Sequence, residues 1–151
     1  LKLAQSGVIL DHLAEKHGRF GARNAAERRE IWRWILFDNH KFTGYFATYR
    51  FMRAFMPEPD PAVVAFLKGR ADSAFGIVEK HLVDRPFMLG SELTIADLSM
   101  TGYLFYPKEE HGYDFAASHP NIAAWIDRVR AMPGWKDPYE ALPGKRMAPL
   151  R

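Results

Sequence analysis

The stretch Leu93-Thr94-Ile95-Ala96-Asp97-Leu98 decides the fold. Thr94 and Asp97 stand three residues apart, the spacing of a capping box, in which each side chain hydrogen-bonds the backbone N–H of the other at a helix start. We therefore expect a helix that begins at Thr94 and continues to about Tyr106, where Pro107 ends it. Thr94 and Asp97 receive a structural role in this interpretation.

The rest of the chain repeats this helical pattern, with caps and prolines at the expected ends. The expected helices run from Ser6 to His17, Asn24 to Phe55, Pro61 to Leu82, Thr94 to Tyr106 and Pro120 to Met132, with a short turn over Tyr139–Leu142. Residues 108–119 are expected to be a loop, and Pro143–Arg151 a loose tail. Alternating strand patterns and Asn-Gly or Asp-Gly hairpin signals are missing. The sequence predicts an all-α bundle of five to six helices.

Composition narrows the class of protein. The chain has 151 residues, a formal net charge of +3 and no cysteine. Scattered basic residues do not favour a nucleic-acid partner, and no apolar run approaches the roughly 18 residues that span a bilayer. The absence of cysteine excludes a disulfide scaffold, a cysteine-ligated metal site and a cysteine nucleophile in this chain. We expect a cytoplasmic protein that binds neither nucleic acid nor membrane.

The second expected helix is unusually aromatic. Nine of the 21 aromatic residues lie within residues 32–56. On a helical wheel one face carries Ile31, Trp34, Phe42, Tyr45, Tyr49, Met52 and Met56. A second apolar sector, with Phe37, Phe51 and Phe55, lies roughly 100° away. Two interpretations stay open: the helix is buried all round, or the second sector meets a partner subunit, a ligand or another domain.

Three acidic residues are candidates for functional groups. Asp38 interrupts the aromatic face, so its carboxylate is solvated, paired or functional, and an ordinary salt bridge to Lys41 or an arginine is the favoured account. Glu109 and Glu110 are adjacent, which favours a hydrated loop surface over acid–base chemistry. The six histidines have no ligand spacing, so we expect no metal site.

Gln5 and Ser6 begin the first expected helix. A serine hydroxyl and the free N–H groups of a helix N-terminus form a ready site for a carboxylate or phosphate. The plain alternative is that Ser6 only caps the helix.

Three segments resemble cytosolic glutathione transferases. Leu3–Glu15 resembles the family's Gln/Glu-Ser-x-x-Ile-x-x-Tyr-Leu stretch, which begins the last helix of its thioredoxin-like N-terminal domain. Phe87–Asp97 resembles the capping-box signature of the all-helical C-terminal domain, and Pro120–Trp135 is similar to the closing helix. The resemblance implies that residues 1–20 are the last helix of a truncated thioredoxin-like domain and residues 21–151 a helical C-terminal domain.

The resemblance also implies site residues. Gln5 and Ser6 would hold the γ-glutamyl end of glutathione, and His40-Lys41 resembles a His-Lys pair that bacterial beta-like members place beside it. Asp38-Asn39 precedes this pair where the family more often has Glu-Leu. The apolar substrate wall is assigned, from aromatic placement, to Phe42, Tyr45, Tyr49, Tyr103 and Tyr106.

The resemblance implies that the intact parent is a homodimeric detoxification enzyme that joins the thiol of glutathione, its co-substrate, to a hydrophobic electrophile. The family's catalytic Cys, Ser or Tyr lies upstream of residue 1, so we expect no conjugating activity from this chain alone. The alternative is a non-catalytic helical interaction module of the same fold. Gln5-Ser6 distinguishes the two, because a scaffold needs no site for the carboxylate of glutathione.

Overall fold

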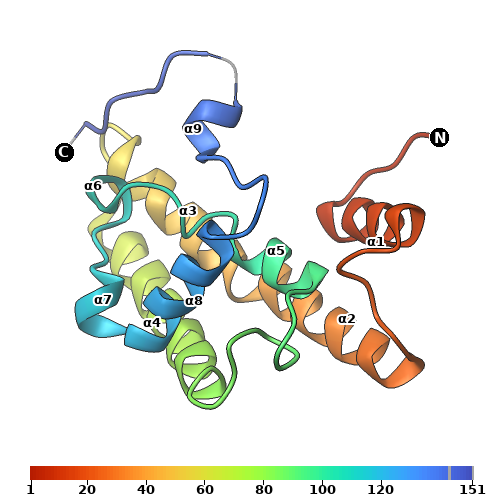
Figure 1. Cartoon of the computed structure of the whole chain (residues 1–151). Helices are drawn as coiled ribbons and strands as arrows, with labels where there is room; N and C mark the ends of the chain where they lie inside the picture. The colour runs from red at the N-terminus through yellow and green to blue at the C-terminus, as the bar shows by residue number, and fades with distance from the viewer. Residues whose placement is uncertain (143, 151) are drawn as a thin grey trace.

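The computed structural model describes residues 1–142 and 144–150 of the chain. Within them the backbone forms helices and no strand (Figure 1). The helices are α1 (Ser6–His17), α2 (Ala25–His40), α3 (Thr43–Ala54), α4 (Pro61–His81), α5 (Ile95–Thr101), α6 (Lys108–His111), α7 (Phe115–Ser118), α8 (Pro120–Arg130) and α9 (Pro138–Ala141). The predicted all-α fold is confirmed.

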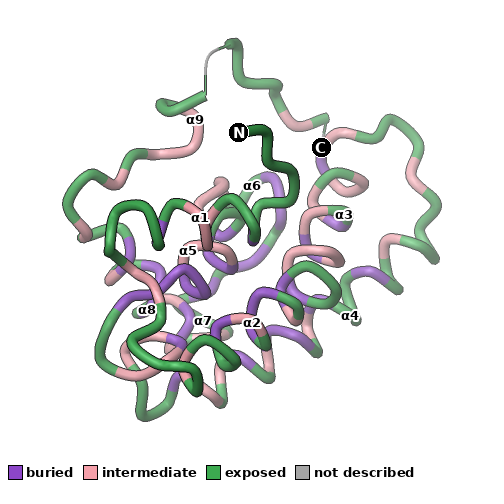
Figure 2. Tube along the Cα trace, turned by 90° about the vertical axis from the view of Figure 1, so that its right-hand side faces the viewer, coloured by how far each residue is buried: buried purple, intermediate pink, exposed green. Residues whose placement is uncertain are grey.

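The helices pack around one core. α5 lies in the middle and contacts α1, α2 and α8, while α4 packs against α3 and α8 (Figure 1). The largest fully buried side chains include Phe42, Phe46, Phe75 and Trp125. Figure 2 shows the buried stretches on the facing sides of these helices, whereas α1 is exposed along most of its length. α1 is therefore the least covered long helix of the bundle.

Asp97 joins three segments at the centre of the molecule. Its Oδ2 accepts hydrogen bonds from the N–H and Oγ1 of Thr94, at 2.8 and 3.0 Å. Its Oδ1 accepts the N–H of Met88 at 2.8 Å and the indole N–H of Trp125 at 2.9 Å. The carboxylate is fully buried, so these donors replace the hydrogen bonds that water would make to it in the unfolded chain. The predicted capping box is present and also fastens α8.

The expected single helix from Asn24 to Phe55 is wrong. It breaks at Lys41 and Phe42, and the structure has α2 and α3 in its place. Asp38 explains the break: its carboxylate accepts the N–H of Thr43 at 3.2 Å and the Oγ–H of Ser99 at 2.6 Å. The expected salt bridge to Lys41 or an arginine is therefore also wrong. Burial raises the pKa of Asp38, and the two donors oppose that rise.

Other boundaries also differ from the sequence prediction. The helix at Thr94 ends at Thr101, and the expected loop of residues 108–119 contains α6 and α7. The tail is not loose over its described part, because the N–H of Leu150 donates to the carbonyl of Ala54 at 2.7 Å and Arg146 pairs with Glu110 at 3.1 Å. Pro143 and Arg151, the ends of that expected tail, lie outside the described residues.

Candidate functional site

The N-terminus of α1 has an unusual backbone. Gln5 is the residue before the helix, with φ +71° and ψ +120°, and Ser6 is the first helical residue. The expectation that Ser6 caps the helix is therefore wrong, and no side chain supplies a cap hydrogen bond there. A left-handed φ at a residue other than glycine is strained, and such strain gathers at functional sites. Ser6 is exposed, whereas Gly7, the next residue of α1, is buried.

Gly7 sets the distance between α1 and α2. A Cβ atom at Gly7 would lie 2.7 Å from Cγ2 of Ile35 and 3.7 Å from the ring of Trp32. The N-terminal turn of α1 therefore rests on the C-terminal half of α2. His40 ends α2 about one turn beyond Ile35, and Lys41 follows; both side chains are exposed. Gly7, next to Ser6, thus lies against Ile35, five residues before His40 in the chain.

An aromatic and charged cluster lies where α3, the chain after α5, and α9 meet. The guanidinium of Arg50 stacks over the ring of Tyr106, with its carbon 3.7 Å from the ring centre. Tyr106 also contacts Tyr103 and Tyr139, with ring centres 5.6 and 5.2 Å apart. Arg50 donates from Nη2 to the hydroxyl of Tyr139 at 2.9 Å. We call Arg50, Tyr103, Tyr106 and Tyr139 the tyrosine–arginine cluster.

Glu110 balances the charge of this cluster. Its Oε2 accepts Nε–H of Arg50 at 2.8 Å and is also bonded by Nη2 of Arg50. Its Oε1 accepts the hydroxyl of Tyr139 at 2.8 Å and Nη2 of Arg146 at 3.1 Å. The side chain of Glu110 is 0% exposed, so the expected hydrated surface is wrong for this residue, although Glu109 is exposed. Burial and the Glu110 carboxylate raise the pKa of Tyr139.

The five residues assigned to the substrate wall separate into two groups. Phe42 and Tyr49 lie in the core, 1% and 5% exposed, where Phe42 packs edge-on against Phe75. Tyr103 is exposed, and Tyr45 and Tyr106 are half-buried. Of these, only Tyr103 and Tyr106 belong to the tyrosine–arginine cluster, since Tyr45 instead accepts a hydrogen bond from Arg70 at 3.3 Å.

Sequence reasoning missed Arg50 and Tyr139, and it treated Glu110 as solvated. The useful signal was the position of Arg50 within an aromatic helix, since a guanidinium among apolar side chains requires a carboxylate or aromatic partner. The partners lie 60 and 89 residues further along the chain. No spacing rule connects residues so far apart.

Two negative findings apply to residues 1–142 and 144–150. No group of three or more His, Asp or Glu side chains in that part of the chain could hold a metal ion. None of the helices described there has the length and apolar character that crossing a bilayer requires.

Comparison with known proteins gives one consistent family. Residues 61–128 match the family described as "Glutathione S-transferase, C-terminal domain". Glutathione S-transferase F14 of Arabidopsis thaliana is 25% identical over 148 residues, which is 89% of this chain and 58% of that protein. The chain thus spans less than two thirds of the length of this relative.

Solved structures agree with the sequence matches. A glutathione S-transferase from Xanthobacter autotrophicus superposes with a TM-score of 0.82 and 30% identity, over 93% of this chain and 69% of that one. A glutathione transferase from Burkholderia graminis superposes with a TM-score of 0.74 and 25% identity, over 88% of this chain and 57% of that one. The Burkholderia crystal structure has two glutathione molecules bound per protein subunit.

Proposed function

The chain belongs to the glutathione transferase family, and from that premise we propose that it binds glutathione at the N-terminus of α1. Gln5 and Ser6 are the proposed contacts for the γ-glutamyl end of glutathione. The supporting observation is the strained Gln5 backbone, with φ +71°, next to an exposed serine at the start of a 12-residue helix. The first amides of α1 and its dipole favour an anionic group there.

His40 and Lys41 are the proposed second contact with glutathione. They lie at the break between α2 and α3, and both are exposed. A lysine ammonium attracts a carboxylate, and a neutral imidazole can donate or accept a hydrogen bond. Glutathione carries two carboxylates, so one at Ser6 and the other toward Lys41 would use both ends of the tripeptide.

The proposed reaction is conjugation of the glutathione thiol to an apolar electrophile. The thiolate sulfur forms a bond to the electrophilic carbon, and the displaced group leaves with the electron pair of its own bond. Lowering the pKa of the thiol requires a nearby donor or positive charge. We assign that task to a thioredoxin-like domain, of which residues 1–20 would form the last helix, and we assign the apolar wall to Tyr103 and Tyr106.

The exposed side of α1 supports this division into two domains. Leu3, Val8, Ile9 and Leu13 are each at least 38% exposed. Four large apolar side chains on one short segment are costly to leave in water, at about 25 cal/mol for each Å² of apolar surface. A thioredoxin-like domain packed against this side would bury them.

We further propose a homodimer through the outer face of α2. Leu36 is 63% exposed there and shares a shallow hollow with Trp32 and the side chains of Arg28, Arg29 and Arg33. This surface differs from the predicted second sector of Phe37, Phe51 and Phe55, which the break between α2 and α3 divides and whose Phe37 packs against the core. A symmetric partner would bury Trp32 and Leu36 and leave the arginines at the rim.

Retention on immobilised glutathione tests the proposal. The intact protein should be retained, Ser6→Ala should abolish retention, and Ser91→Ala should not, because Ser91 is an exposed serine outside the proposed site. If the intact protein passes through unretained, the transferase interpretation fails and a helical interaction module of the same fold becomes the better account.

A further inference from the structure

Glu110 collects donors from three separate parts of the chain. Arg50 comes from α3, Tyr139 from α9 and Arg146 from the C-terminal segment, and all three bond to its carboxylate. The side chain of Glu110 is 0% exposed and that of Arg50 is 13% exposed. Hydrogen bonds between charged groups at such a buried position are stronger than those at the surface.

Two of these donors also contact Tyr106, a residue of the proposed apolar wall. Arg50 covers one face of the Tyr106 ring at 3.7 Å, and Tyr139 meets Tyr106 edge-on with ring centres 5.2 Å apart. Arg146 lies over the ring of Tyr139, 4.8 Å from its centre. The carboxylate therefore fixes two neighbours of Tyr106 at once.

The backbone of Tyr106 is held by the residue next to Glu110. Nε2 of His111 lies 2.9 Å from the carbonyl oxygen of Tyr106, and Nδ1 of His111 accepts the N–H of Tyr113 at 3.1 Å. α6 itself is fastened to α3, because Nη1 of Arg53 donates to the carbonyl of Glu109 at 2.6 Å. Ring and backbone of Tyr106 thus both depend on the short helix that carries Glu110.

We propose that Glu110 is a positioning residue that fixes the ring of Tyr106 in the apolar wall and so determines how tightly the apolar part of a ligand is bound. The inference rests on the proposed function, because it assigns Tyr106 to that wall. Glu110 touches no ligand; it acts through Arg50 and Tyr139. The C-terminal segment takes part through Arg146, which binds the same carboxylate.

The test compares two ligands on the intact protein. The affinity for glutathione reports on the proposed tripeptide site alone. S-hexylglutathione carries an additional apolar chain that the wall would contact. Isothermal titration gives both dissociation constants, and their ratio reports the wall separately from the tripeptide site. Because the hexyl chain buries apolar area, we expect the wild type to bind S-hexylglutathione at least about tenfold more tightly.

Glu110→Gln removes the charge that fixes Arg50, so we expect this advantage to fall about tenfold, with little change in glutathione affinity. Arg146→Ala is the second variant, because it keeps the Arg50–Glu110 pair and so preserves the fold even if Glu110→Gln does not. We expect it to reduce the affinity advantage of S-hexylglutathione about threefold. Glu109→Gln removes the same charge one residue away on an exposed side chain, and Lys145→Ala alters an exposed neighbour of Arg146. Both controls should keep the wild-type ratio.

Three results would overturn the inference, and they are distinguishable. An unchanged ratio in Glu110→Gln and Arg146→Ala makes Glu110 a residue of the fold only. If the wild type binds glutathione and S-hexylglutathione with equal affinity, the protein has no such wall. The proposed tripeptide site is then supported and the inference about Glu110 is not. A wild type that binds neither ligand removes the proposed function and the inference together.

Discussion

The indole N–H of Trp125 donates to Oδ1 of Asp97 across 2.9 Å, and this bond fastens α8 to the first turn of α5. The two residues lie 28 positions apart, and both are 0% exposed. Three more donors, from Met88 and Thr94, complete the shell of the carboxylate. Asp97 is thus the point at which a local capping box becomes a tertiary link between helices.

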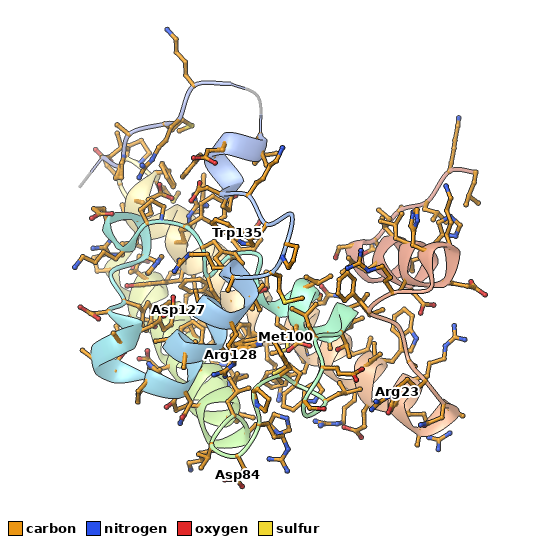
Figure 3. The ribbon with its side chains drawn as sticks, viewed as in Figure 1. Arg23, Asp84, Met100, Asp127, Arg128 and Trp135 are labelled. Atoms are coloured by element: carbon orange, nitrogen blue, oxygen red, sulfur yellow. The ribbon has the colours of Figure 1, made fainter. Side chains whose placement is uncertain are left out.

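Removal of this carboxylate should destabilise the protein strongly. Asp97→Ala leaves buried N–H and O–H donors of Met88, Thr94 and Trp125 without an acceptor, and we expect a loss of about 3 kcal/mol or more in the free energy of unfolding. Asp84→Ala is the matched control, because Asp84 is exposed at the turn after α4 (Figure 3), and it should change stability by less than about 0.5 kcal/mol. Urea unfolding measures both, and equal losses would contradict the role of Asp97.

Two glycines should respond in opposite directions to alanine. A Cβ at Gly44 would lie 2.7 Å from the backbone oxygen of Asn39, so Gly44→Ala must open the bend between α2 and α3. We expect a loss of about 1–3 kcal/mol. A Cβ at Gly69, inside α4, meets nothing within 4 Å, so Gly69→Ala should stabilise the helix by up to about 1 kcal/mol. Thermal unfolding distinguishes the two, and a neutral Gly44→Ala would contradict the close approach at the bend.

His111 should make the protein sensitive to acid. Burial lowers its pKa, the cations of Arg50 and Arg53 lower it further, and the Tyr106 carbonyl and Glu110 oppose this. The folded protein therefore binds a proton at His111 less readily than the unfolded chain. The stability that His111 contributes is present above its unfolded pKa of about 6.5 and is lost as the pH falls through its lower folded value.

The variant His111→Gln tests this pH dependence. A glutamine is neutral at every pH and can still donate to the carbonyl of Tyr106. Between about pH 7.5 and about pH 5.5, the unfolding temperature of the wild type should fall more than that of His111→Gln. The buried carboxyls Asp38 and Asp97, whose pKa values burial raises, contribute equally to both proteins and favour the folded state as the pH falls. Parallel pH curves would contradict the prediction.

The parts of the fold that the sequence predicts are those fixed by neighbouring residues. The capping box at Thr94 and Asp97 follows from a spacing of three, and α4 begins where Asp60 and Pro61 indicate. The break between α2 and α3 has no such local signal. It depends on Asp38, which accepts the N–H of Thr43 and also the hydroxyl of Ser99, a residue 61 positions away. A pattern along one helix could not show that contact.

In the candidate site, too, the sequence predicts features that depend on neighbouring residues and misses those that depend on distant contacts. The motif Gln5-Ser6 is local, so it could be recognised, whereas the left-handed backbone of Gln5 became visible only in the structure. Glu110 looked like a solvated residue because its partners, Arg50 and Arg146, lie 60 and 36 residues away. The wheel placed Phe42 and Tyr49 on one face of a continuous helix, but the structure breaks that helix at Lys41 and Phe42. Both residues are buried, and a wheel could not tell a face buried in the core from one that a ligand reaches.

The central claim is that glutathione binds at the N-terminus of α1, and calorimetric titration of the intact protein with glutathione tests it most directly. We predict saturable binding by the wild type and a dissociation constant raised at least about tenfold by Ser6→Ala, since a hydrogen bond to a charged group contributes about 1.5–3 kcal/mol. Absence of binding by the wild type, or an unchanged dissociation constant in Ser6→Ala, would contradict the claim.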